Sequence, residues 1–306
     1  MVTEDPLILL FPRFVSTEEV AILRRMAEET ASSAVGHTLD SDNERWSAEE
    51  RMLIRRVEDR IGEITGCAPH LEETPLVVLH VACSPVRPPV VQRPRRYPVA
   101  PPSRFPRGLH IDTNGDKERR FATSILYLST PTAGGQTCFP LAAARDPCME
   151  ADEQQAALTA ARELLQHDVR HAGNTRRPAG AQLHDAAVRA ASTYDESGAP
   201  RPGVEVITTG RGAAIKAVAG NMVVFWTRHP TGIEERSWHG GELVPSESAA
   251  DKWAITKFKE IPTSTYADPE RCAAFIARSR ELALKMQSFN PAVARRSDSL
   301  VCRGVA

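Results

Sequence analysis

The stretch FATSILYLS, residues 121–129, decides the expected fold, because β-branched and aromatic side chains dominate it. Four further stretches share this texture: LVVLHVA (76–82), GAAIKAV (212–218), NMVVFW (221–226) and KWAITKF (252–258). Turn-forming Gly, Pro, Asn and Asp residues separate these short runs. Most of the runs have no helical pattern between them, so we expect an antiparallel sandwich or jelly roll.

The first third of the chain reads as helical, and a further helix is expected near the C-terminus. Two capping boxes precede apolar stripes at helical spacing, and the second stripe stops at Gly66. The tail helix starts with a capping acid followed by proline at the first helical position. The capping residues are Ser16 with Glu19, Ser47 with Glu50, and Asp268 with Pro269.

Two long segments interrupt the strand pattern. Residues 84–107 contain eight of the 23 prolines and six arginines, and no acidic residue. Residues 141–209 contain one helical pattern and are otherwise a polar loop. The Gly220-Asn221 pair is interpreted as a hairpin turn. We expect one domain over residues 1–262, including both segments, and a helical tail over residues 263–306.

Composition excludes several classes of protein. Lys plus Arg (38) nearly balances Asp plus Glu (39), which argues against nucleic acid or an anionic membrane as partner. The six cysteines form no CxxC pair, so a zinc ribbon or thioredoxin-like motif is not expected. The N-terminus does not resemble a signal peptide, and no apolar run reaches the ~18 residues of a membrane span. A soluble, cytoplasmic protein is the expectation.

The motif His110-Ile-Asp112 is the first candidate for chemistry. Residues i and i+2 of a strand face the same side, so both side chains can reach one metal ion. Alone, the motif is as readily a surface histidine beside a loop aspartate. A second histidine far downstream, His239, completes a two-His-one-carboxylate triad. Such a triad leaves three positions open on Fe(II), two for a chelating 2-oxo acid and one for dioxygen.

Two further motifs lie between Asp112 and His239, and a third follows His239. They are Gly134-Gly-Gln-Thr-Cys-Phe-Pro140, Gly220-Asn-Met-Val-Val-Phe225 and Lys252-Trp. With them the sequence, from about Leu7 to Ile261, resembles the Fe(II)/2-oxoglutarate dioxygenases of the prolyl 4-hydroxylase type. The resemblance implies a mainly β (α+β) fold with a double-stranded β-helix core, a jelly-roll or cupin-like variant. It also implies Fe(II), the cosubstrate 2-oxoglutarate and dioxygen, with ascorbate as a candidate cofactor.

The resemblance assigns iron binding to the triad His110, Asp112 and His239. It matches Lys252 to the basic residue that pairs with the distal carboxylate of 2-oxoglutarate. It matches Tyr127 and Thr256 to hydroxyl groups on that carboxylate. Simpler alternatives stay open: an edge-strand position for the lysine, and plain core positions for the tyrosine and the threonine.

The stretch before His110 does not carry the Tyr-x-x-Gly-Gln-x-Tyr motif of peptidyl-prolyl hydroxylases, which favours an amino-acid-like or natural-product small molecule as substrate. Its arginines suggest that this substrate is anionic, because Arg binds carboxylate or phosphate through a bidentate fork. The alternative is a solvated proline-rich loop of the SH3-ligand kind. The candidate substrate-binding residues are Arg95, Arg96, Arg107 and Trp238, although a tryptophan such as the last is more often a packing residue than a substrate contact.

The expected reaction is hydroxylation, desaturation or oxidative cyclisation at an unactivated C–H bond, with decarboxylation of 2-oxoglutarate to succinate. Peptidyl-prolyl 4-hydroxylation is the alternative, and a non-catalytic jelly-roll binding module is a third hypothesis. Halogenation is disfavoured because Asp112 is present. Zinc hydrolases rank low because they do not require the Lys252 and Tyr127 pattern. The other seven histidines lack ligand context and are expected to be structural or exposed.

Overall fold

A computed structural model of the chain describes residues 2–4, 6–32, 37–83, 110–113, 117–139, 142, 206–209 and 212–288. The proline- and arginine-rich stretch 84–107 lies outside the described residues, and with it Arg95, Arg96 and Arg107. The helix expected within 141–209 also lies outside them.

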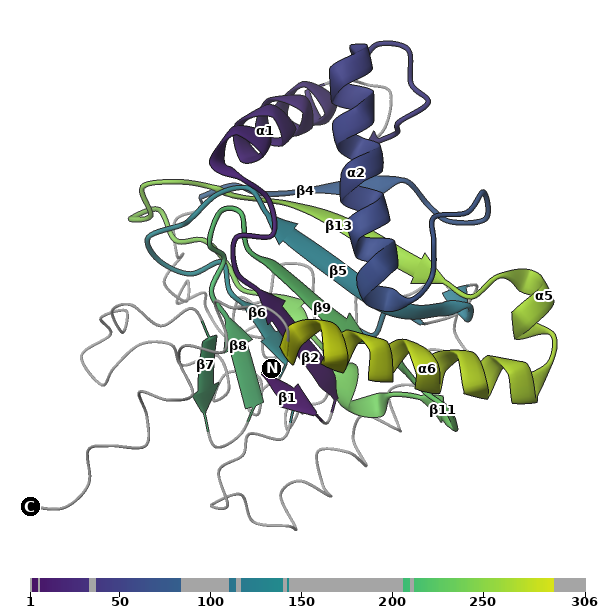
Figure 1. Ribbon diagram of the computed structural model, residues 1–306. Helices are drawn as coiled ribbons and strands as arrows, with labels where there is room; N and C mark the ends of the chain where they lie inside the picture. The colour runs from purple at the N-terminus through teal and green to yellow at the C-terminus, as the bar shows by residue number, and fades with distance from the viewer. Residues whose placement is uncertain are drawn as a thin grey trace, which may run out of the picture.

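Two antiparallel sheets form the centre of the described structure (Figure 1). The larger has seven strands in the spatial order β1 (Thr3–Glu4), β2 (Leu7–Phe11), β9 (Met222–Trp226), β5 (Arg120–Tyr127), β13 (Lys252–Glu260), β4 (Leu76–Val81) and β3 (Thr38–Leu39). The smaller has, among the described residues, the order β12 (Gly240–Gly241), β6 (Thr137–Phe139), β8 (Gly212–Ile215) and β7 (Val206–Thr209). A short hairpin pairs β10 (Arg228–His229) with β11 (Gly232–Ile233).

The larger sheet is buried on both faces. Because side chains alternate along a strand, β13 directs Trp253 and Ile255 into one core and Ala254 into the other. The first core lies against helices α1 (Thr17–Ala31), α2 (Ala48–Thr65) and α6 (Pro269–Ser288). The second includes residues of β6 and β8, so it fills the space between the two sheets. The helices and the smaller sheet therefore cover opposite faces of the larger sheet.

The helix boundaries follow the predicted caps. Both capping boxes are present, at Ser16 and at Ser47, and Gly66 ends α2 in the left-handed conformation. Asp268 accepts hydrogen bonds from the backbone N–H groups of Glu270 and Arg271, at the start of α6. The tail is not separate from the core, because Ile276 of α6 is buried in the helix-side core. The short helix α5 (Thr263–Tyr266) precedes α6, and the short 3-10 helix η2 (Glu235–Ser237) lies between β11 and β12.

Three expectations from the sequence are corrected. The first third is not wholly helical, because Leu7–Phe11 forms β2, which pairs with β9. The segment 141–209 is not loop to its end, because Val206–Thr209 forms β7. The Gly220-Asn221 turn does not close a hairpin within one sheet, because it joins β8 of the smaller sheet to β9 of the larger.

Within the described part of the chain, no helix is long and apolar enough to cross a lipid bilayer.

Candidate metal centre

Three side chains with metal-binding groups converge between the two sheets, and we call His110, Asp112 and His239 the His–Asp–His cluster. Their ligand atoms all lie within 4.8 Å of one another. A pair of backbone hydrogen bonds, each 3.0 Å from N to O, joins the two histidines to each other. The chain therefore brings together the three residues that the sequence predicted as metal ligands.

The carboxylate of Asp112 lies between the two imidazoles. Oδ1 is 3.5 Å from Nε2 of His110, and Oδ2 is 3.5 Å from Nε2 of His239. These separations are long for hydrogen bonds and suit ligand atoms that share one ion. Burial alone would raise the pKa of Asp112, but the two histidines and a hydrogen bond from Thr123 outweigh it and hold that pKa well below its usual range.

His239 is oriented by its backbone and by aromatic neighbours. Its Nδ1 lies 3.0 Å from the carbonyl oxygen of Ser237, so Nδ1 carries the proton and Nε2 presents its lone pair to the cluster. Phe225 of β9 and Phe139 of β6 pack against the ring, with centroids 4.6 and 5.5 Å away. Burial lowers the pKa of His239 to about 4, against the opposing effect of Asp112. The imidazole is thus neutral, as a metal ligand must be.

The residues present fit a divalent cation. The cluster offers two imidazole nitrogens and one carboxylate, the ligand set typical of non-haem Fe(II) sites. Asp112 and His239 are buried, at 7% and 4% exposure, whereas the side chain of His110 is 42% exposed. The cluster is therefore buried on one side and open on the other, at His110.

Lys252 lies in the same space between the sheets. It begins β13, is 1% exposed, and its Nζ donates to Oγ1 of Thr137 at 3.4 Å. The hydroxyl of Tyr127 lies 2.8 Å from that same Oγ1. Burial raises the pKa of Tyr127, so its phenol stays protonated. Since β13 runs between β5 and β4, the edge-strand alternative for Lys252 is wrong.

Strand β6 connects this lysine to the cluster. Thr137 and Phe139 are two residues apart and share one face of the strand, about 7 Å apart along it. Phe139 packs on His239, whereas Thr137 contacts Lys252. The cluster and the lysine therefore contact neighbouring positions on one face of β6, and the Lys252 amine is one of the groups that lower the pKa of His239. Gly241 of β12 lies beside the amine, since a Cβ added there would be in ordinary van der Waals contact with Nζ, at 3.8 Å.

Two other predicted site residues are described. Thr256 is buried at 8% exposure, on the same face of β13 as Lys252, but the hydroxyl hydrogen-bonded to Lys252 belongs to Thr137. Trp238 is 3% exposed, and its indole N–H has no hydrogen-bond partner in the described structure. Sequence reasoning missed Thr137, although it lies inside the Gly134–Pro140 motif, two residues before Phe139.

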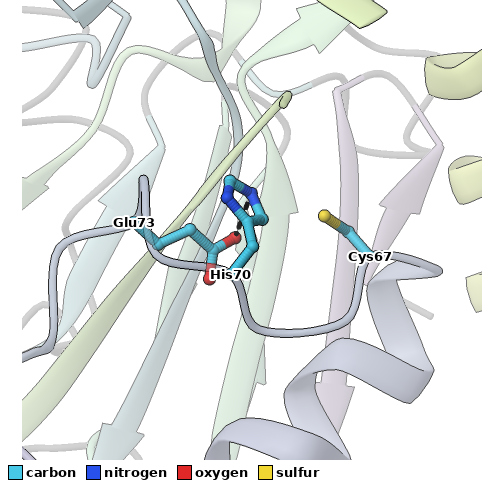
Figure 2. A group of neighbouring side chains, drawn as sticks. All are labelled: Cys67, His70 and Glu73. Atoms are coloured by element: carbon cyan, nitrogen blue, oxygen red, sulfur yellow. Dashed lines mark ion pairs between the residues drawn. The ribbon is translucent and has the colours of Figure 1, made fainter. Parts of the chain in front are cut away.

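A second group of metal-binding side chains lies at the end of α2, and we call Cys67, His70 and Glu73 the Cys–His–Glu cluster (Figure 2). It meets the same 4.8 Å spacing as the first cluster. Nε2 of His70 lies 3.4 Å from Oε1 of Glu73 and 2.9 Å from the carbonyl oxygen of Glu260. Figure 2 shows the imidazole facing the carboxylate, with the thiol to one side.

The surroundings of the Cys–His–Glu cluster do not fit a cation. Nζ of Lys259 lies 2.6 and 2.9 Å from the two carboxylate oxygens of Glu73, and Nζ of Lys257 lies 3.4 Å from one of them. Lys259 therefore already neutralises the carboxylate, and Lys257, which also pairs with Glu58 at 2.7 Å, lies beside it. Burial raises the pKa of Cys67 to about 11, which keeps the thiol protonated. The expectation that His70 is structural agrees with this arrangement.

Comparisons with known proteins add little. No protein-family model matches the chain, and no curated protein matches it significantly. Solved structures that resemble it include the viral collagen prolyl hydroxylase of Paramecium Bursaria Chlorella virus-1 in its 2OG complex (14% identity, TM-score 0.40, 84% of this chain and 98% of that one). Another is a Pseudomonas putida prolyl-4-hydroxylase (11% identity, TM-score 0.35, 83% and 88%). TM-scores this low assign neither fold nor function, which leaves the residues of the site to decide.

Proposed function

We propose that the chain is an Fe(II)/2-oxoglutarate-dependent dioxygenase, with a double-stranded β-helix core of the prolyl 4-hydroxylase type. One observation carries the proposal. A His–Asp–His cluster that is open only at His110 and a buried lysine lie in the same space between two sheets, and both contact strand β6. The first suits a divalent cation with open positions, and the second suits an anionic group a few ångströms away.

In the proposed site, His110, Asp112 and His239 hold Fe(II). The bound iron supplies the activation of dioxygen, coupled to decarboxylation of 2-oxoglutarate. Lys252 holds the distal carboxylate of the cosubstrate by a charge-assisted hydrogen bond. The hydroxyls of Tyr127 and Thr137 lie beside that amine and offer further donors to the same carboxylate. The hydrogen bond between His239 and the Ser237 carbonyl keeps Nε2 aimed at the metal.

The residues around the cluster also exclude water. Phe225 and Phe139 cover the His239 ring, and both are fully buried. Excluding water from this side of the cluster strengthens electrostatic interactions there and protects reactive species from solvent. The exposed side of the cluster, at His110, is then the side from which the substrate approaches.

The proposed substrate is a small, anionic, amino-acid-like or natural-product molecule that is hydroxylated, desaturated or cyclised. Sequence alone supports this part, through the arginines that precede His110, among them Arg95, Arg96 and Arg107. Peptidyl-prolyl hydroxylation is the competing substrate class. The substitutions Arg95→Ala and Arg96→Ala raise the Michaelis constant for the true substrate if these side chains bind it. An unchanged Michaelis constant argues against their role.

The test of the cosubstrate site is calorimetric, with Mn(II) in place of Fe(II) under anaerobic conditions. Lys252→Met weakens 2-oxoglutarate binding by roughly 10–100-fold, because a hydrogen bond to a charged group contributes about 1.5–3 kcal/mol. A 2-oxo acid without the distal carboxylate binds both proteins equally weakly. Lys216→Met, at a half-buried lysine just after β8, is the matched control and leaves binding unchanged.

Two outcomes would contradict the proposed function. One is wild-type protein that binds no divalent metal, or binds 2-oxoglutarate no better with metal than without it. The other is a Lys252→Met variant that loses affinity equally for both 2-oxo acids, which would show that the lysine does not contact the distal carboxylate. Uncoupled succinate formation with Fe(II) separates an enzyme from a binding module, which forms none.

A further inference from the structure

Thr123 contacts the His–Asp–His cluster, and neither the sequence motifs nor the proposed function gives this residue a role. It lies in the middle of β5, paired with Phe225 of β9 on one side and with Phe258 of β13 on the other. Its side chain is 1% exposed, and Oγ1 donates to Oδ2 of Asp112 at 2.7 Å. That distance is typical of a strong hydrogen bond from a hydroxyl to a carboxylate.

The backbone fixes this hydroxyl in place. Because side chains alternate along β5, Thr123 shares a face with Ile125 and Tyr127, both of which belong to the core between the sheets. A β-branched residue in a central strand also has few rotamers available. The donor is therefore held rigidly on one side of the carboxylate. The same strand carries Tyr127, so β5 supports the cluster at one point and the lysine at another.

The hydrogen bond makes the two oxygens of Asp112 unequal. Each oxygen lies 3.5 Å from one imidazole, Oδ1 from His110 and Oδ2 from His239, but Oδ2 also accepts the hydrogen bond from the Thr123 hydroxyl. A carboxylate with one oxygen engaged by a rigid donor is favoured to bind a metal through a single oxygen. Single-oxygen binding matters here because a chelating 2-oxo acid and dioxygen together need three positions on the ion.

We propose that Thr123 is a positioning residue of the metal centre, which orients Asp112 and limits it to one coordination position. The inference rests on the proposed function, which assigns a metal to the cluster and open positions on it to the 2-oxo acid and dioxygen. Partners of this kind, outside the ligands themselves, typically change metal affinity by about 10–100-fold when removed.

The experiment is Co(II) binding to the metal-free protein, followed by visible absorption, which reports both affinity and coordination geometry. Thr123→Val removes the hydroxyl and keeps the shape of the side chain. It raises the dissociation constant for Co(II) by about 10–100-fold and alters the spectrum. Thr123→Ser restores the hydroxyl and brings both readouts back toward wild type. Should the valine variant fail to fold, Thr123→Ala carries the same expectation.

Ser124→Ala is the matched control. Ser124 is the next residue of β5, is equally buried, and donates to the carbonyl of Lys257 at 3.4 Å on the other face of the strand. Its loss leaves Co(II) affinity and spectrum unchanged. The inference is overturned if Thr123→Val binds Co(II) with the wild-type constant and spectrum, or if the valine and serine variants are impaired alike. Wild-type protein that binds no Co(II) refutes the metal assignment itself, which is a different failure.

Discussion

The His–Asp–His cluster and the Cys–His–Glu cluster meet the same spacing of ligand atoms, but their charges differ. In the first, the carboxylate contacts two imidazoles and a hydroxyl. In the second, two lysine amines lie against the carboxylate. The first carboxylate can attract a cation, whereas the charge of the second is already balanced by Lys259, beside the Lys257–Glu58 pair. Ligand spacing alone therefore does not define a metal site; the charge already present around the ligands has to be counted as well.

The largest expected effect in this comparison is at the His–Asp–His cluster. His239→Ala abolishes Fe(II)- and 2-oxoglutarate-dependent succinate formation, because two remaining ligands hold the ion weakly and the buried Nε2 donor is gone. The measurement is succinate released per enzyme, together with bound metal after dialysis. His229→Ala, at an exposed histidine of β10, is the control and keeps full turnover. Turnover retained at the wild-type level in His239→Ala would refute the iron assignment.

The next largest effect is at the Cys–His–Glu cluster, and it is on stability. Lys259 and Glu73 are both fully buried, so Lys259→Met leaves a carboxylate with only part of its compensation. We expect a loss of about 3–5 kcal/mol in the free energy of unfolding, measured by urea denaturation. Lys285→Met removes an exposed lysine that pairs with Glu281 at the same 2.6 Å distance, and we expect it to leave the free energy of unfolding almost unchanged. Equal losses in the two variants would mean that burial of the pair does not matter.

A smaller effect is expected from the thiol at alkaline pH. Since burial raises the pKa of Cys67 to about 11, the folded protein holds that proton after an unfolded chain has released it. The stability that this provides is complete below the ordinary thiol pKa and is lost as pH rises from about 9 toward 11, by on the order of 2 kcal/mol. Urea denaturation across this range shows a shallower decline for Cys67→Ala than for wild type. Parallel declines contradict the assignment of a protonated thiol.

The smallest expected effect is none. His70→Asn leaves the number of bound Co(II) ions unchanged, because the Cys–His–Glu cluster already has its carboxylate neutralised by lysine. Metal content after equilibrium dialysis checks this against wild type and His239→Ala. A loss of one bound ion in His70→Asn would show that the second cluster binds metal despite its lysines.

Local signals in the sequence were sufficient for the helices. The capping boxes at Ser16 and Ser47 and the left-handed Gly66 depend only on neighbouring residues, and all three are confirmed. Strand β2 was not foreseen because Leu7–Phe11 is apolar at every position. Its side chains enter both cores, Leu9 on the helix side and Ile8 between the sheets, so the alternation that marks a half-exposed strand is missing.

The residues of the candidate site likewise fall into those that the sequence predicts and those that it does not. The members of the His–Asp–His cluster could be predicted because His110 and Asp112 are close in sequence and a later histidine fitted the pattern. The partners that support them could not be. Thr123 reaches Asp112 and Thr137 reaches Lys252 only because separate strands are brought side by side. Such contacts depend on the relative placement of strands, which one sequence does not specify locally.

The reciprocal backbone hydrogen bonds between His110 and His239 have a consequence for synthesis of the chain. Contacts between residues so distant in sequence close late, because the loop between them loses much conformational entropy. A nascent chain that has not yet emerged past His239 carries only two of the three ligands. Under the proposed function, binding of the metal by all three ligands therefore waits until the chain has been synthesised past His239.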